Sequence, residues 1–347
     1  MAEETNERNT SIPRGYKPED SAARVEWVKE FTGIEIDNTP EDDPEDLKGI
    51  IENHVGFMKV PMAVVGPMLL DGVYAKGEFS VPLCTIEGTL AMSMNRGILA
   101  SYLCGGTTGR HFRQELFRAP VFQYTVQNYV VLDIVLDTGN AAGQNMVTLA
   151  AQVACELIRK ETGHNYFLES NINSDKKPSV RNMLLGRGHA VAAETVIKNS
   201  VMKKVLKMDP DVLFKSWPYY STISSMAGIH GNGIHESNAL TAIYLATGQD
   251  AACAAENSTA HFSIEKLDDA LKFKLTLPSL TIGTVGGGTR LKMQKKNLEM
   301  LGCAEGEYSS RKLAEIIAGA TLALDISLVC AIGSHTFTDA HMKYGRK

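Results

Sequence analysis

Four ionisable side chains in this 347-residue chain are of the types that perform acid–base chemistry. Lys176 stands in an Asp-Lys-Lys-Pro turn, and its ammonium group could stabilise a developing alkoxide. Glu87 could donate a proton if burial, or a neighbouring carboxylate such as Asp250, raises its pKa. His341 could protonate a leaving group, because the ordinary pKa of histidine lies near neutrality.

Each of these residues also has an interpretation without chemistry. An acidic residue just before a helix, such as Glu87, can simply match the helix dipole. An Asp-Lys-Lys-Pro turn is commonly a solvated loop, and Asp250 after Gly248-Gln249 can form an ordinary turn. A histidine close to a C-terminus is commonly exposed. Taken singly, none of the four residues identifies a site.

The composition excludes several classes of protein. Hydrophobic residues make up 44% and charged residues 22%, which is typical of a globular protein in water. The net charge of −5 without a basic stripe argues against nucleic acid or an anionic membrane as a partner. We expect no membrane-spanning run, and the polar, acidic N-terminus is neither a signal nor a transit peptide. Six scattered cysteines without metal-binding spacing predict reduced thiols, no metal and a cytoplasmic location.

Hydrophobic periodicity places these residues on elements. We expect helices at residues 21–32, 89–103, 146–160, 238–247 and 307–331, and strands at residues 124–136, 165–169, 190–197 and 271–277. The first helix should be amphipathic, with Ala22, Val25, Val28 and Phe31 on one side. The segment 124–169 is predicted to be a compact β–turn–α–β unit, distinct from its flanks.

In the order Glu87, Lys176, Asp250 and His341, the four side chains match the catalytic tetrad of the 3-hydroxy-3-methylglutaryl-CoA (HMG-CoA) reductase family. From about Arg14 to its C-terminus the chain resembles that family, most closely its soluble branch. The motifs that carry the resemblance are residues 52–56 running on to 66–67, 85–89, 174–178 and 248–250. The family reduces a thioester to an alcohol with two equivalents of NADPH.

The resemblance implies a role for each member of the tetrad. Lys176 would stabilise the hemithioacetal and aldehyde oxygens, and Glu87 would protonate the aldehyde oxygen. Asp250 would tune both residues, and His341 would protonate the departing CoA thiolate.

The resemblance also implies a substrate pocket and a cofactor site. Positions that match CoA- and substrate-contacting residues of the family are Glu52, Asn53, Ser93, Asn95, Arg96, Arg118, Asp175, Lys177, His235 and Asn238. Arg118 matches the arginine that clamps the free carboxylate of the substrate, a role suited to a bidentate guanidinium. Positions that match NADPH-contacting residues are Asn140, Gly143, Gln144, Asn145, Met146, Gly286, Gly287 and Gly288.

The implied fold is α+β. A large substrate-binding domain at residues 21–120 and 172–332 would carry an inserted, shortened ferredoxin-like small domain at residues 121–171. Residues 1–20 would be a flexible N-terminus and residues 333–347 a C-terminal flap. We expect a homodimer or a higher even oligomer, because the family completes its active site across a dimer interface.

Three departures from the family bear on the cofactor and the substrate. Phe122 is followed at once by Gln123, where the family carries several tens of residues, including a basic turn that grips the NADPH phosphates. Asn140 stands where the family has an aspartate. Ile86 replaces a threonine of the acyl pocket, and residues 215–218 differ in character. These departures predict that NADPH binding is weakened or lost.

Three functions therefore remain open. The first is NADPH-dependent reduction of HMG-CoA to mevalonate. The second is a repurposed enzyme that keeps the acyl pocket and performs non-redox chemistry on an acyl thioester. The third is a non-catalytic binding or assembly protein built on the same dimer.

Overall fold

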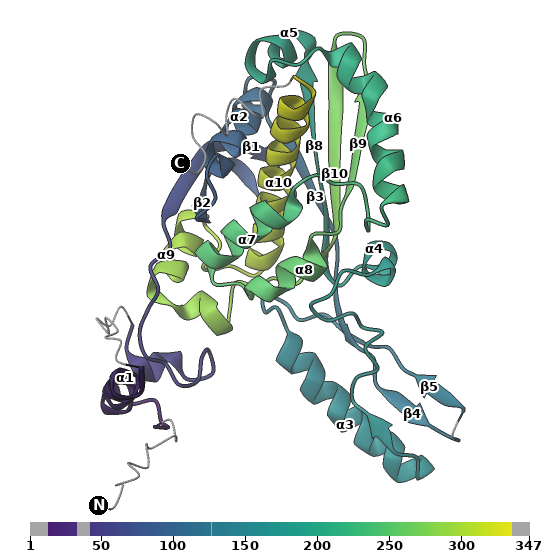
Figure 1. The fold of residues 1–347 in the computed structure, drawn as a ribbon. Coiled ribbons are helices and arrows are strands. Elements are labelled where there is room, and N and C mark those ends of the chain that lie inside the picture. The colour runs from purple at the N-terminus through teal and green to yellow at the C-terminus, as the bar shows by residue number, and fades with distance from the viewer. Residues whose placement is uncertain (1–12, 33–41, 126, 335–347) are drawn as a thin grey trace, which may run out of the picture.

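The computed structural model describes residues 13–32, 42–125 and 127–334 (Figure 1). The predicted tetrad member His341 and nearly all of the predicted flap lie outside these ranges.

A large, mainly antiparallel sheet forms the centre of the described chain. Its strand order is β2 (Lys76–Cys84), β1 (Met62–Asp71), β3 (Thr107–Arg118), β8 (Gly188–Lys198), β10 (Ala270–Leu280) and β9 (His261–Lys266), with β6 (Ile134–Leu136) paired to the end of β3. Only the contact between β1 and β3 is parallel among these pairs. The predicted strands 190–197 and 271–277 are confirmed as the central strands β8 and β10.

The apolar helix α10 (Ser309–Gly333) lies across this sheet and forms its core (Figure 1). Helix α2 (Leu90–Tyr102) packs beside α10 at Gly97, where an added Cβ would lie 1.8 Å from the carbonyl oxygen of Ala323. Only a glycine permits such a close approach of two helix backbones. Both predicted helices are thus confirmed.

The expectation that no apolar run is long enough to span a membrane was wrong. Helix α10 has the length and composition of a membrane span. However, 89% of its most apolar window is buried inside the protein, which is the environment of a core helix.

The other helices surround the sheet. They are α1 (Pro18–Thr32), α4 (Val180–Leu185), α5 (Asn199–Val201), a π-helical turn η2 (Met202–Leu206), α6 (Pro210–Met226), α7 (Glu236–Thr247), α8 (Ala254–Asn257) and α9 (Lys292–Met300). Short 3-10 turns are η1 (Pro44–Leu47), η3 (Ala251–Cys253) and η4 (Gly287–Arg290). The predicted helix 238–247 is confirmed as α7, which packs between β2, α9 and α10.

Helix α1 is confirmed, and on its predicted apolar side Val25 and Val28 are half-buried. Its buried side chains include Ser21 and Arg24, whereas Ala22 is exposed. Arg24 donates to the carbonyl oxygen of His54 over 2.7 Å, and the Ser21 hydroxyl also reaches His54. The helix is therefore anchored by polar contacts to the loop that holds Glu52 and Asn53.

The segment between β3 and α4 stands apart from the large sheet, at the lower right of Figure 1. It contains α3 (Gln144–Thr162) and a three-stranded sheet of β5 (Tyr129–Val131), β4 (Val121–Gln123) and β7 (Tyr166–Phe167). The predicted helix 146–160 and the second predicted strand are confirmed as α3 and a shorter β7.

The predicted single strand 124–136 was wrong. The Thr125 hydroxyl accepts backbone hydrogen bonds from Gln127 and Asn128, which forms a turn instead of extended chain. Beyond that turn, β5 pairs with β4, whereas β6 crosses to pair with β3 of the large sheet. A run of β-branched residues predicts extended backbone, but it does not show where the chain changes sheets.

Candidate active site

Lys176 and Asp250 lie in direct contact. The Lys176 ammonium nitrogen is 2.7 Å from Oδ2 of Asp250. Asp250 follows Gly248, which ends α7, and its other oxygen accepts the backbone N–H of Ala252 to begin η3. This hydrogen bond with Asp250 raises the pKa of Lys176 above its ordinary value, so the ammonium group is charged at neutral pH.

A buried ion pair stabilises the Lys176 loop. The sequence did not reveal this pair. Arg187 donates from one nitrogen to both oxygens of Glu256, over 2.7 and 2.9 Å, and neither side chain is exposed. The second oxygen of Glu256 also accepts the backbone N–H of Lys176 over 2.7 Å. Lys176 has a left-handed backbone with φ of 56°, so this contact holds an unfavourable conformation in place. The sequence signal was an acidic residue inside a run of small, apolar residues.

Arg118 ends β3 and belongs to the same cluster. Its guanidinium is almost fully buried and lies 3.3 Å from Asp175, the residue before Lys176. It also forms an ion pair with Glu169 and donates to the Thr148 hydroxyl over 2.7 Å. Burial lowers the pKa of Arg118, while Asp175 opposes that effect.

Lys177 is exposed, as Lys176 is, but among the contacts within the described chain it donates only to the backbone carbonyl of Asp175, over 3.0 Å. The two neighbouring lysines therefore have different surroundings.

Glu87 lies elsewhere, in the loop between β2 and α2. Its carboxylate accepts a hydrogen bond from the Asn238 amide over 3.2 Å. Asn238 also contacts Nδ1 of His235 over 2.9 Å, so the structure brings these three predicted site residues together.

Two buried carboxyl groups support the turn that holds His235. Asp325, on α10, accepts the backbone N–H groups of Ile234 and His235 over 3.4 and 3.1 Å. Glu236 accepts the Ile234 N–H over 3.0 Å and is hydrogen-bonded to Asp325. Burial raises the pKa of both carboxyl groups, and two acids in contact share a proton more readily than they both ionise.

Helix α7 separates the two halves of the predicted tetrad within one chain. Glu87 contacts Asn238 at the start of α7, whereas Asp250 follows its end. A helix of 12 residues is about 18 Å long. The expectation that Asp250 directly couples Glu87 to Lys176 therefore does not hold inside a single chain.

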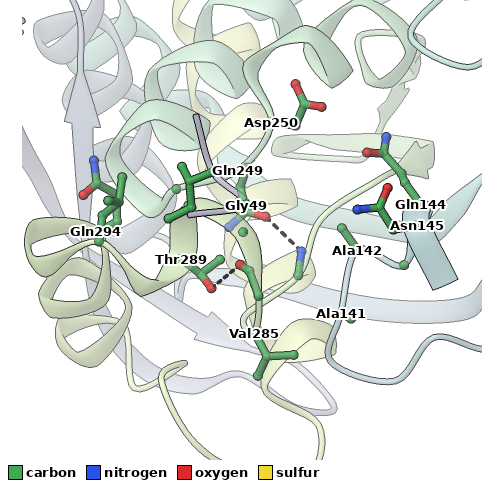
Figure 2. Close-up of a pocket in the computed structure, with 18 of the residues that line it drawn as sticks. Gly49, Ala141, Ala142, Gln144, Asn145, Gln249, Asp250, Val285, Thr289 and Gln294 are labelled. Carbon is green, nitrogen blue, oxygen red and sulfur yellow. Dashed lines mark hydrogen bonds between the residues drawn. The ribbon is translucent and has the colours of Figure 1, made fainter. Parts of the chain in front are cut away.

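A cavity of about 720 Å³ lies beside Asp250 (Figure 2). Its walls are the start of α3, residues 143–146, the glycine turn 286–288, residues 248–250, and parts of α9 and the loop at residues 49–50. Figure 2 shows Gln144 and Asn145 on the side of the cavity opposite Gln294. Most of the predicted cofactor residues thus share one cavity with a predicted catalytic residue.

Two features of the cavity suit an anionic, flat ligand. Helix α3 begins at Gly143 without a capping side chain, so its first backbone N–H groups face outward without a local partner. Gly286 and Gly287 have positive φ values of 79° and 54°, and a Cβ added to either would meet no protein atom within 4 Å. However, none of the described residues that line the cavity is a lysine or an arginine.

Asn140 differs from the other predicted cofactor residues, because it lies outside the cavity lining. Its amide nitrogen donates to the carbonyl of Gly306 over 2.8 Å, and its oxygen accepts the N–H of Ser310 over 3.1 Å. Both polar atoms are therefore occupied by the chain itself.

The predicted CoA-contacting residues of α2 make internal contacts as well. Arg96 donates to the hydroxyl and the carbonyl of Ser327 over 2.9 and 2.6 Å, and Asn95 accepts the Gly66 N–H over 2.8 Å. Ser93 is half-buried on the same helix. Glu52 and Asn53 are exposed on the loop after η1.

The described residues contain no cluster of three or more side chains that could hold a metal ion. All six cysteines lie in the described part of the chain and are free thiols.

Comparison with known proteins connects this geometry to one family. A sequence model of hydroxymethylglutaryl-coenzyme A reductase matches residues 20–129 and 123–346. The 3-hydroxy-3-methylglutaryl-coenzyme A reductase of Aeropyrum pernix is 35% identical over 382 residues, covering 96% of this chain and 91% of the relative. The enzyme of the same name from Methanocaldococcus jannaschii is 35% identical, with 93% and 92% covered.

The two matched segments overlap at residues 123–129, directly after Phe122, where the connection is short. The alignment with the Aeropyrum protein is also longer than the 347 residues of this chain, so some residues of the relative have no counterpart here.

Solved structures show the same fold. The class II 3-hydroxy-3-methylglutaryl-CoA reductase of Streptococcus pneumoniae, bound to NADPH in open conformations, superposes with a TM-score of 0.67 at 18% identity, covering 85% of this chain and 81% of that one. Another structure of the Streptococcus pneumoniae enzyme gives 0.66 at 17% identity, with 82% and 88% covered. With relatives at 35% identity over nearly the whole length and a sequence model that matches most residues, this chain belongs to the hydroxymethylglutaryl-coenzyme A reductase family.

Proposed function

We propose that this protein is an oxidoreductase that reduces the thioester of HMG-CoA to mevalonate with NADPH. The observation that carries this proposal is the contact between Lys176 and Asp250 at the wall of the cavity that holds the predicted cofactor motif. Close similarity to reductases over nearly the whole chain favours this function over the non-redox and assembly alternatives.

The start of α3 and the glycine turn 286–288 are the parts that would hold NADPH, which supplies the hydride when bound. The free N–H groups of the helix would donate hydrogen bonds to phosphate oxygens, and the absence of Cβ atoms leaves room for a ring against the turn. We propose that binding is weaker than in relatives with a full-length small domain, because the described lining offers no cationic side chain to the phosphates.

Lys176 acts as the oxyanion stabiliser in this proposal. Its ammonium group remains charged because of Asp250, and the buried Glu256 fixes the backbone that presents it. A positioned positive charge beside a developing alkoxide stabilises the transition state more than the ground state. Glu87, steadied by Asn238, donates the proton to the aldehyde oxygen, and His341 protonates the CoA thiolate.

We further propose a homodimer or a higher even oligomer in the cytoplasm, in which Glu87 of one copy meets Lys176 of another. The separation of Glu87 and Asp250 by the length of α7 supports this arrangement. Residues 121–171 would act as a small cofactor domain, and residues 21–120 and 172–332 as the large domain. Residues 1–20 and 333–347 would be the flexible N-terminus and the flap.

The two adjacent lysines give a matched test. NADPH oxidation, followed by its absorbance with HMG-CoA as substrate, should fall about 10²- to 10³-fold or more in Lys176→Ala. Lys177→Ala should change the rate by less than about tenfold, because its side chain makes only a surface contact within the described chain. Equal losses in the two variants, or no NADPH oxidation by the wild-type protein, would contradict the proposal.

A further inference from the structure

Arg118 occupies a sheltered position between the lysine loop and the cavity. Its guanidinium contacts Asp175, immediately before Lys176, and also donates to the carbonyl of Gln144, a cavity-lining residue, over 3.3 Å. The Arg118 side chain is only 6% exposed. A substrate carboxylate that binds here must therefore find donors that the protein has not already used.

Most donors of Arg118 are already engaged by groups of this chain, and among the described residues only its Nε has no partner. One terminal nitrogen of Arg118 is shared between Asp175 and Glu169, and the other donates to Thr148 and Gln144. The amide of Asn173 donates to Glu169 over 3.3 Å and holds its carboxylate at this position. Arg118 is thus surrounded like a carboxylate-binding arginine, but the carboxylate that it binds belongs to this chain.

The charges of the cluster add a second obstacle. Two arginines, Arg118 and Arg187, face three carboxylates, Asp175, Glu169 and Glu256. An incoming carboxylate would add a further negative charge beside Asp175 and Glu169, and like charges at close range in a buried site repel strongly.

The three carboxylates differ in how readily they can leave. Glu256 is fully buried and Asp175 is 22% exposed, whereas Glu169 is 44% exposed and lies after the two-residue strand β7. Rotation of Glu169 into solvent would expose the guanidinium without moving the loop of Lys176. The internal competitor that a substrate can displace is therefore Glu169.

On the basis of the proposed function, we propose that Glu169 occupies the place on Arg118 that the free carboxylate of the substrate would take. Glu169 is then a specificity-determining residue. It disfavours acyl thioesters that carry a free carboxylate, relative to 3-hydroxyacyl thioesters that lack one, and its side chain must rotate away before HMG-CoA can bind.

Two ligands and one change of charge test this inference. HMG-CoA carries a free carboxylate, whereas 3-hydroxybutyryl-CoA is a 3-hydroxyacyl thioester without one. In the whole protein as purified, Glu169→Gln should bind HMG-CoA about tenfold more tightly by calorimetry, because a charge-assisted contact becomes available. Binding of 3-hydroxybutyryl-CoA should stay within about twofold, and Glu169→Ala should give the same contrast between ligands.

Glu161→Gln is the matched control. Glu161 is an exposed carboxylate at the end of α3, so its replacement makes the same change of net charge away from Arg118. Glu161→Gln should change the affinity for neither ligand. Unchanged HMG-CoA binding in both Glu169 variants, or equal tightening of both ligands, would overturn the inference.

The binding measurement does not depend on turnover. A wild-type protein that binds HMG-CoA without oxidising NADPH would contradict the proposed function. The contrast between the two thioesters would still decide the role of Glu169.

Discussion

Glu87 and Lys176 should complement each other between two copies of the chain. Within one copy, Glu87 lies at the start of α7 and the Lys176–Asp250 pair lies beyond its end, about 18 Å away along the helix. A proton donor must come within hydrogen-bond reach, about 3 Å, of the oxygen that it protonates. A site that uses both residues therefore requires Glu87 from a second copy.

The expected recovery follows from the symmetry of a dimer. Glu87→Gln and Lys176→Ala should each be inactive alone, because every site in either homodimer lacks one group. When the two variants pair at random, about half of the dimers are heterodimers. Each heterodimer has one site with intact Lys176 from one copy and intact Glu87 from the other. The mixture should therefore show about a quarter of the wild-type activity.

The assay is NADPH oxidation with HMG-CoA after the two variants are co-expressed with different affinity tags, which also isolates the heterodimer. The purified heterodimer should have about half of the wild-type activity. The control is wild-type chain mixed with the double variant Glu87→Gln/Lys176→Ala, whose heterodimer should be inactive. A heterodimer of single variants no more active than either variant alone would show that Glu87 acts on its own chain, and the argument from α7 would fail.

Three other predictions follow from individual contacts. Glu256→Gln removes the closer of the two carboxylates that face the buried Arg187, so it should cost about 3–5 kcal/mol and lower the melting temperature by about 4–7 °C in a thermal scan. An unchanged melting temperature would contradict the buried pair. Gly287→Ala places a side chain on a backbone with φ of 54° at the cavity wall, so NADPH affinity should fall about tenfold by calorimetry while HMG-CoA binding is retained; loss of both would point to a folding defect instead. Burial lowers the pKa of His111 to about 4 and of His189 to about 3. As the pH falls from about 6.5 towards 4, the unfolded chain takes up protons that the folded chain does not, so stability should decline, by about 2 kcal/mol at pH 5 from His189 alone. Denaturant titrations at pH 7 and pH 5 should show this loss, and His189→Gln should reduce it.

The sequence predicted the long, regular elements well. Helices α3, α7 and α10 carry sustained apolar patterns, and β8 and β10 are dense in apolar residues, so local pattern and burial agree there. It failed where tertiary contacts decide. The buried face of α1 depends on the carbonyl of His54, which only the folded chain places beside Arg24. The break between β5 and β6 depends on which sheet offers a free edge.

The site was predictable in its parts but not in its assembly. Motif resemblance identified the lysine loop, the glycine turn and the acidic residues that the structure gathers around two ends of α7. The Arg187–Glu256 pair was missed because its members are 69 residues apart and neither belongs to a motif. The contact between Glu169 and Arg118 was missed for the same reason, since a surface glutamate carries no sign of its partner in the sequence.

Asn140 makes internal contacts that an aspartate at the same position could not make in full. In sequence, an asparagine in place of an aspartate indicated a lost cofactor contact. In the structure its amide donates to Gly306 and its oxygen accepts from Ser310 at the start of α10, and a carboxylate could make only the second of these contacts. Its backbone carbonyl also accepts the N–H of Thr284, just before the glycine turn. Asn140 therefore holds together the segments around the cavity. The case for weak NADPH binding depends on the lack of lysine and arginine in the described lining and on the short connection after Phe122.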